Sequence, residues 1–349
     1  MAVSTASVVC RHVQARLTDS SRIDKADSSP VTVADFAAQA VINAMLPDQI
    51  DLGSGPVVPF TMVGEESASM LKAERVAGIG PDAGLGAAIA DALDHSGAMK
   101  RPSCDDLIDL IDRAKPTGPL PETFWTADPI DGTRGFLKGR QYAVCLALIH
   151  RGRPVVGLLA CPNLGDTDQR DPSGSPVIDA RNSGTLVAGW SGSAVQVAPI
   201  DKPDLLAGLT IDSDKSHSTI LMTQGVEPGQ SKLARYSVLT SQLDSMSAKT
   251  GRAVGPTWRL DSQAKYALVA IGRADVYIRF PYHTGSGNEN IWDHASGALL
   301  CQQAGCVVTD LDGTELDFSR PALATNRGVL AAAAELHAII RQAISAAGL

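Results

Sequence analysis

The hexapeptide DPIDGT at residues 128–133 is the most informative segment of this chain, and it lies within the run WTADPIDGTRGFLKGRQYAVCLALI at residues 125–149. Two carboxylates three residues apart, held by a proline and followed by a Gly-Thr turn, can bind hard cations while the amides of the turn face a phosphate. Oxygen ligands of this kind favour Mg²⁺, which binds few protein carboxylates and keeps several waters. The same residue types are ordinary turn residues, so a plain surface turn is the alternative.

The residues after the hexapeptide predict a hairpin of two strands. The runs at 141–149 and 154–161 are rich in β-forming residues and are separated by Arg151-Gly152-Arg153, which is a hairpin signal. A third run of the same kind covers 184–188. The intervening residues 163–183 are rich in Gly, Pro, Asp and Ser and therefore predict a solvated loop within the first lobe.

Upstream of the hexapeptide, acidic residues are expected near the ends of two elements. Residues 30–45 predict a loop followed by a helix, because Thr32 precedes Asp35 at capping-box spacing and apolar residues follow at helical spacing. Asp35 then lies in the first helical turn. The run at 61–63 predicts a short strand that ends next to Glu65. Three further helices are expected, at residues 9–17, 83–93 and 104–114.

The C-terminal part predicts a second lobe, with a boundary near residues 199–203. Strands and helices alternate beyond that boundary, which suggests an α/β arrangement. The expected elements are at residues 209–212, 262–271, 274–280 and 293–304. We therefore predict an α+β lobe at 1–200 and an α/β lobe at 201–349. Asp293, in the run IWDH, begins the last of these elements, and a helix N-cap is the alternative role for it.

Length and composition are those of an ordinary globular protein. The chain has 349 residues, of which 44% are hydrophobic, and this is enough for two packed lobes. A formal net charge of −8 argues against a general nucleic-acid or anionic-membrane surface. No apolar run reaches the about 18 to 20 residues of a membrane span. We expect a cytoplasmic protein; the acid-free residues 1–18 leave an organelle-targeting segment as the alternative to an amphipathic first helix.

The six cysteines show neither the C-x-x-C spacing nor the histidine pairing of a zinc site. They are expected to be reduced and mostly buried. A redox switch between Cys301 and Cys306 is the alternative to two small buried side chains. The cysteines are Cys10, Cys104, Cys145, Cys161, Cys301 and Cys306.

Taken together, the acidic elements resemble a known family. In their order along the chain they are similar to the Mg²⁺-dependent, lithium-sensitive phosphatases of the inositol monophosphatase superfamily. The matching stretches are SPVTVADFAAQ (29–39), VGEES (63–67), DPIDGT, GVEPGQSK (225–232), LDSQAKYALVAIGRADVYIR (260–279) and IWDHASG (291–297). Within the superfamily, DSQAKY and the extension GFLKGRQYAVCLALI resemble the 3′(2′),5′-bisphosphate nucleotidase branch, whose members remove the 3′-phosphate of adenosine 3′,5′-bisphosphate.

The resemblance implies a fold and a set of site residues. The fold is a layered αβαβα sandwich of two lobes, the first α+β and the second α/β. Asp35 and Thr133 would orient the attacking water. Two to three Mg²⁺ ions would be held by Glu65, Asp128, the carbonyl group of Ile130, Asp131 and Asp293.

The resemblance also implies which residues bind the substrate. Lys265 and Arg279 would meet the 5′-phosphate of the nucleotide. In inositol monophosphatases the position matching Arg279 is acidic, so a basic residue there favours a substrate with two phosphates. Gln230 departs from the branch, which carries histidine at that position. The implied substrate contacts are Thr133, Gln230, Ser262, Lys265, Arg279 and Asp293.

The resulting prediction is a hydrolase acting on adenosine 3′,5′-bisphosphate, and also on 3′-phosphoadenylyl sulfate, in sulfate assimilation. Two alternatives stay open. One is an inositol polyphosphate 1-phosphatase or inositol monophosphatase that uses the same metal site. The other is a non-catalytic nucleotide-binding protein, which would lack some of the carboxylates. The predicted partner is a small-molecule substrate, with no nucleic acid or membrane, and the superfamily contains both monomers and dimers.

Overall fold

The computed structural model describes most of the chain: residues 1–16, 22–24, 30–53, 56–80, 83–165, 183–208, 219–226, 229–281, 289–326 and 328–349. Within these ranges, the side chains of 22–24, 30–32 and 229–231 are left out of the description. The strand expected at 209–212 lies outside the described residues, as do Leu17 and most of the loop expected at 163–183.

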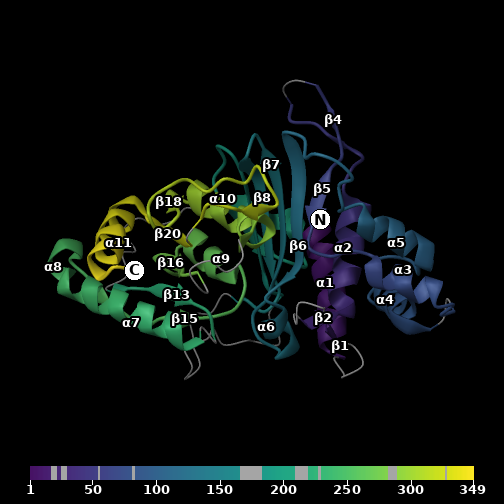
Figure 1. The fold of residues 1–349 in the computed structure, drawn as a ribbon, viewed down its shortest axis with the longest axis horizontal. Helices are drawn as coiled ribbons and strands as arrows, with labels where there is room; N and C mark the ends of the chain where they lie inside the picture. Colours follow the sequence, from purple (N-terminus) through teal and green to yellow (C-terminus); the bar gives the residue numbers. More distant parts are fainter. Residues whose placement is uncertain are drawn as a thin grey trace.

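The molecule contains two main sheets. Together with the helices that cover their faces, these sheets form five layers (Figure 1). The large sheet has the order β11-β10-β9-β8-β7-β6-β5, and all neighbours are antiparallel except β5 and β6. The small sheet has the order β15-β13-β16-β20-β18. Helices α1 and α2 cover the outer face of the large sheet, α9 and α10 lie between the sheets, and α7 and α11 cover the far face of the small sheet. The expected layered αβαβα fold is confirmed.

The elements have the following bounds. The strands of the large sheet are β5 (Met62–Gly64), β6 (Thr123–Asp131), β7 (Ala143–His150), β8 (Arg153–Cys161), β9 (Thr185–Trp190), β10 (Gln196–Pro199) and β11 (Ala207–Gly208). Those of the small sheet are β13 (Met222–Gln224), β15 (Trp258–Arg259), β16 (Val276–Arg279), β18 (Cys306–Thr309) and β20 (Val329–Ala333). Short pairs are formed by β1 (Arg22–Asp24) with β2 (Pro30–Thr32), β3 (Gln49–Ile50) with β4 (Val58–Pro59), β12 (Thr219–Ile220) with β14 (Ala253–Val254), and β17 (Glu289–Asn290) with β19 (Ala322–Leu323). The helices are α1 (Ala2–Gln14), α2 (Val33–Met45), α3 (Ser69–Val76), α4 (Gly84–His95), α5 (Cys104–Asp112), α6 (Thr133–Leu137), α7 (Gly229–Ser245), α8 (Ser247–Thr250), α9 (Ala264–Ala270), α10 (Ala295–Gln303) and α11 (Ala334–Ala347), with 3₁₀ turns η2 (Pro203–Leu205) and η3 (Ile291–Asp293).

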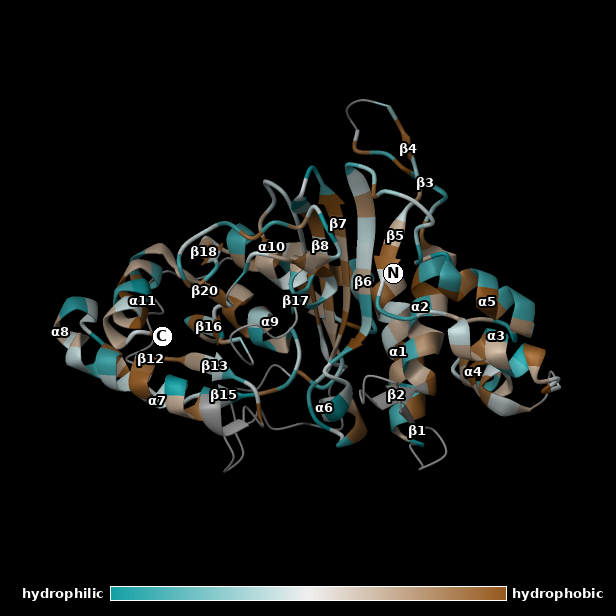
Figure 2. Cartoon of the chain, viewed as in Figure 1, coloured by the Kyte–Doolittle hydropathy of each residue, from teal (hydrophilic) through white to brown (hydrophobic). Residues whose placement is uncertain are grey.

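The hairpin predicted after the hexapeptide is present as β7 and β8. Arg151 and Gly152 connect the strands with φ angles of 49° and 71°, and two left-handed residues form the tight turn whose twist matches the strands. Strand β7 is buried along nearly its whole length because helices pack on both faces of the large sheet. Its apolar composition is visible in Figure 2.

Three other expectations concern the chain as a whole. All six cysteines are free, and Cys10, Cys145, Cys161 and Cys301 are buried, as expected. Among the helices of the described residues, none combines the length and the apolar character that crossing a bilayer requires. The large sheet continues to β11 at Gly208, so the lobe boundary near residue 200 stays a prediction.

Candidate metal centre

The two aspartates of the hexapeptide are brought to one side of β6 by a bulge. Asp128 pairs with Cys145 and Asp131 pairs with Ala143, so three steps on β6 match two steps on β7. Residues three apart on a regular strand point to opposite faces, and one extra residue restores the same face. Pro129 lies within this irregularity, where its missing N–H costs no ladder hydrogen bond. The plain surface turn is therefore not what the hexapeptide forms.

The turn that follows the bulge is packed tightly against the second half of the chain. Gly132 has a φ of 88°, and a Cβ atom there would lie 2.9 Å from Cβ of Ser262. Thr133 then begins α6, and its hydroxyl group donates to the carbonyl oxygen of Ile130 at 3.2 Å. The backbone N–H of Gln263 donates to the Asp131 carboxylate. Asp131 is thus oriented by a residue from the loop before α9.

Glu65 follows β5, which lies beside β6 in parallel, and the N–H of Glu65 donates to the carbonyl of Ala127 at 3.3 Å. Gln39 of α2 fixes this segment: its side-chain amide donates to the carbonyl of Glu66 (2.8 Å) and accepts from the N–H of Glu66 (3.1 Å). A Cβ atom at Gly64 would lie 2.6 Å from the Gln39 oxygen, so glycine allows this approach. Asp35 lies one turn before Gln39 on α2 and is 2% exposed.

Asp293 completes the carboxylate cluster from η3. Its carboxylate offers an oxygen that, with one oxygen each from Asp128 and Asp131, forms a group in which all three lie within 4.8 Å of one another. Gln263 also holds this turn, because its side chain donates to the carbonyl of Trp292 (2.7 Å) and accepts from the N–H of Gly297 (3.0 Å). Gln263 therefore links the Asp131 carboxylate to the turn that carries Asp293, a role that its place in the DSQAKY motif did not reveal.

The electrostatics of the cluster are those of carboxylates crowded together in a buried site. Burial raises the pKa of Asp128 well above its usual range, and the carboxylates of Glu65, Asp131, Asp293 and Asp35 add to that shift. Burial also raises the pKa of Asp131 to about 6, against the opposing effect of Lys265 and Arg279, and that of Asp293 to about 8. Among the described residues, Oδ1 of Asp128 is buried without a hydrogen-bond partner. An orphaned buried oxygen among crowded carboxylates fits a divalent cation.

Cations border this cluster on the side of the second sheet. Lys265 is 8% exposed, and its ammonium group donates to the carbonyl oxygens of Ser262 (2.6 Å) and Leu260 (3.3 Å). Burial lowers the pKa of Lys265 to about 8. The backbone of Gln230 lies in the first turn of α7, and its side chain is outside the described part of the structure.

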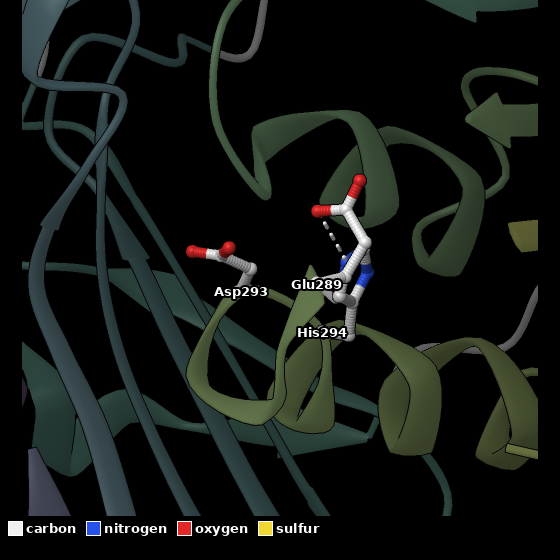
Figure 3. A group of neighbouring side chains, drawn as sticks. All are labelled: Glu289, Asp293 and His294. Atoms are coloured by element: carbon white, nitrogen blue, oxygen red, sulfur yellow. Dashed lines mark ion pairs between the residues drawn. The ribbon is translucent and has the colours of Figure 1, made fainter. Parts of the chain in front are cut away.

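Arg279, at the end of β16, forms a two-pronged ion pair with Glu289: Nε lies 2.9 Å from Oε1, and Nη2 lies 2.6 Å from Oε2. Glu289 is also 3.6 Å from Nε2 of the buried His294. In Figure 3, the Glu289 carboxylate lies beside His294, whereas Asp293 points away from both toward the large sheet. Glu289 could not be identified from the sequence, because it lies in a segment with no periodic pattern.

The layered fold and a cluster of buried carboxylates that could hold a metal ion are what this structure offers for assigning its class. The model of the inositol monophosphatase family matches residues 1–348, and the chain belongs to that family. The resemblance noted from the sequence is thereby confirmed.

Curated relatives and solved structures agree with this assignment. A protein named 3′(2′),5′-bisphosphate nucleotidase from Schizosaccharomyces pombe is 35% identical, with 89% of this chain and 82% of the relative covered. One of the same name from Emericella nidulans is 37% identical, with 89% and 86% covered. The inositol monophosphatase of Thermotoga maritima is similar in fold, with a TM-score of 0.58 at 15% identity over 99% of this chain and 95% of that one. CysQ from Bacteroides thetaiotaomicron gives 0.55 at 18% identity over 95% and 94%.

The position of Gln39 leads to a first prediction. Gln39→Leu removes the side-chain bonds that hold the segment carrying Glu65, and we expect the affinity for Mg²⁺ to fall about 10- to 100-fold. The unpaired backbone groups also lower the free energy of unfolding by about 1–3 kcal/mol. A Mg²⁺ titration of phosphate release and urea denaturation measure the two effects.

Asn43→Leu is the matched control for that prediction. Asn43 lies one turn further along α2, is buried, and donates to the carbonyl of Leu110 at 2.7 Å. Its loss lowers stability but leaves the affinity for Mg²⁺ unchanged. A Gln39 variant with wild-type affinity for Mg²⁺ would contradict the role assigned to this side chain.

Proposed function

We propose that this protein is a Mg²⁺-dependent 3′(2′),5′-bisphosphate nucleotidase, which hydrolyses the 3′-phosphate of adenosine 3′,5′-bisphosphate to give AMP and phosphate. 3′-Phosphoadenylyl sulfate is the second proposed substrate, and sulfate assimilation is the process served. The observation that carries the proposal is the position of two cationic groups, the buried Lys265 and the partly buried Arg279, beside the carboxylate cluster. The phosphate that is hydrolysed would bind at the carboxylate cluster, and the second phosphate of the substrate would bind at the two cationic groups.

The proposed cation ligands are Glu65, Asp128, the carbonyl group of Ile130, Asp131 and Asp293, which together would hold two to three Mg²⁺ ions. When bound, Mg²⁺ supplies Lewis-acid neutralisation of the phosphate and of the leaving oxygen. The carbonyl of Ile130 accepts one hydrogen bond from Thr133 and keeps a second lone pair for a cation.

Asp35 and Thr133 act on the attacking water. Because the Thr133 hydroxyl donates its hydrogen to Ile130, its remaining lone pairs can accept a hydrogen bond from that water. The buried Asp35 carboxylate takes up the proton that the water releases as the phosphorus–oxygen bond forms. The 3′-oxygen of the ribose leaves on the opposite side of the phosphorus.

The second phosphate and the base are recognised by the second half of the chain. Ser262, Lys265 and Arg279 would contact the nucleotide, together with Thr133 and Asp293 at the reacting phosphate. Gln230 can form hydrogen bonds with the adenosine part, although it cannot stack as an imidazole ring does. We further propose that the protein is cytoplasmic and is a monomer or a dimer. Its partner would be a small-molecule substrate, with no nucleic acid or membrane.

A phosphate-release panel tests this function. Adenosine 3′,5′-bisphosphate, its sulfated form, inositol 1,4-bisphosphate and inositol 1-phosphate are compared at equal concentration, with and without Mg²⁺. We expect the adenosine bisphosphate to exceed the inositol phosphates by about 10-fold or more in kcat/KM, because polar groups built for one substrate are left unpaired by another. Millimolar Li⁺ is expected to inhibit. Preference for an inositol phosphate would instead assign the same metal site to that substrate class.

A further inference from the structure

A buried ring nitrogen without a hydrogen bond lies next to the pair formed by Arg279 and Glu289. His294 is fully buried, and its Nε2 atom is 3.6 Å from Oε2 of Glu289, which is beyond hydrogen-bond length (Figure 3). Among the residues that the structure describes, none forms a hydrogen bond with Nε2. A buried polar atom left unpaired costs free energy, so a second arrangement that pairs it would be favoured.

The hydrogen of this part of the ring lies on Nε2. The other ring nitrogen, Nδ1, is 2.9 Å from the hydroxyl oxygen of Tyr266, and a tyrosine hydroxyl group can donate to it. Without a hydrogen, Nε2 would turn a lone pair toward the Glu289 carboxylate, and two acceptors repel each other. Tyr266 therefore donates to Nδ1, and the N–H group at Nε2 faces Glu289.

The three side chains become more buried in the order Arg279, Glu289, His294. Arg279 and Glu289 are 27% and 15% exposed, whereas His294 is 0% exposed. The Nη2 atom of Arg279 is 2.6 Å from Oε2 of Glu289, which is the same oxygen that faces His294. That oxygen can therefore exchange the outer N–H neighbour for the inner one, while Oε1 keeps its 2.9 Å contact with Nε of Arg279.

We propose that His294 is a positioning residue for the second phosphate of the substrate. An incoming phosphate repels the Glu289 carboxylate and attracts the Arg279 guanidinium group. Oε2 of Glu289 then moves inward onto the N–H group of His294, which pairs the buried nitrogen and frees Nη2 of Arg279 for the phosphate. This inference rests on the proposed nucleotidase function, in which Arg279 contacts that phosphate, and adds a residue that acts through Glu289.

Two substitutions separate the roles of the two ring nitrogens. In His294→Asn the amide can still accept from Tyr266 but is too short to reach Glu289, whereas in His294→Gln an amide N–H lies near the position of Nε2. Both variants are assayed with adenosine 3′,5′-bisphosphate and with adenosine 3′-phosphate, which lacks the second phosphate. We expect the ratio of the two kcat/KM values to fall about 10-fold in His294→Asn, mainly through KM for the bisphosphate, because a hydrogen bond to a charged group is lost. His294→Gln should recover most of that ratio.

His337→Asn is the matched control. His337 of α11 is also buried, and its Nε2 atom is 2.9 Å from the hydroxyl oxygen of Thr309 on β18. The same truncation of a buried histidine should lower stability in urea denaturation there too. It should leave the ratio of the two kcat/KM values unchanged, because this residue has no contact with the phosphate subsite.

Binding of AMP gives a readout that does not depend on turnover, since AMP keeps the 5′-phosphate. Calorimetry is expected to show about 10-fold weaker AMP binding to His294→Asn, restored binding to His294→Gln, and unchanged binding of adenosine to both. Equal losses for the two substrates, equal losses in the two variants, or an unchanged affinity of His294→Asn for AMP would overturn the role of His294. Failure of the wild-type protein to hydrolyse the bisphosphate, while AMP binding still follows this pattern, would overturn the nucleotidase function but not the role of His294 at the phosphate subsite.

Discussion

Asp128→Asn is expected to abolish Mg²⁺-dependent phosphate release while raising the melting temperature of the metal-free protein. The Asp128 carboxylate is 2% exposed and faces the negative charges of Glu65, Asp131, Asp293 and Asp35. Its pKa is raised in the folded protein, so at pH 7 the ionised group costs free energy there that it does not cost in the unfolded chain. A neutral amide removes that cost and also removes a proposed ligand.

The two effects have opposite signs, and this makes the result distinctive. Loss of a ligand lowers turnover by about 100-fold or more. Mg²⁺ at about 100 times its Kd stabilises the wild-type protein by about 2.7 kcal/mol, and the variant should lose most of this gain. Thermal unfolding in EDTA and in Mg²⁺, with phosphate release measured on the same samples, gives both numbers.

Asp109→Asn serves as the control, because Asp109 is exposed on α5 and away from the cluster. It should change neither the melting temperature nor turnover. A lower melting temperature of Asp128→Asn in EDTA would show that repulsion between carboxylates is not a significant term in the metal-free protein. Retained turnover would remove Asp128 from the set of ligands.

The elements that could be predicted from the sequence alone are those that local residue patterns specify. The hairpin of β7 and β8 could be identified because the turn at Arg151-Gly152 separates two runs of β-forming residues, and those signals lie within a few residues of the structure they specify. The first turn of α2, with Asp35, was predicted from helical spacing. The convergence of distant carboxylates was inferred from resemblance to a family, since no local pattern relates residue 35 to residue 293.

The contacts that orient the site were not predictable in the same way. Gln39 and Gln263 bind backbone groups of segments far along the chain, and a glutamine carries no sequence signal for such a partner. The proline at position 129 indicated that a bulge could form there. Which side of β6 Asp131 faces, however, depends on the register between β6 and β7. The pairing of Arg279 with Glu289 depends on how the chain returns to the site ten residues later.

That pairing determines how the role of Arg279 has to be tested. Arg279→Met leaves the Glu289 carboxylate without its main counter-charge, next to the expected position of the second phosphate. Because the ion pair is only partly buried, removing one partner costs less than in a fully buried pair, and we expect the free energy of unfolding to fall by about 1–3 kcal/mol. We expect kcat/KM for adenosine 3′,5′-bisphosphate to fall about 100-fold or more, because the carboxylate left without its partner repels the phosphate. Activity on adenosine 3′-phosphate, which lacks that phosphate, should fall much less.

The double variant Arg279→Met/Glu289→Met separates charge from geometry. It removes one positive and one negative charge, so the net charge of the subsite is that of the wild-type protein, and two apolar side chains replace the ion pair. We expect stability to return, with kcat/KM for the bisphosphate within about 10-fold of the wild-type value, because Lys265 still supplies positive charge and only the donor groups of Arg279 are lost. Urea denaturation and kinetics on the two adenosine phosphates measure this. A double variant as impaired as Arg279→Met would mean that the guanidinium group itself, rather than the balance of charge around Glu289, controls the choice of a substrate with two phosphates.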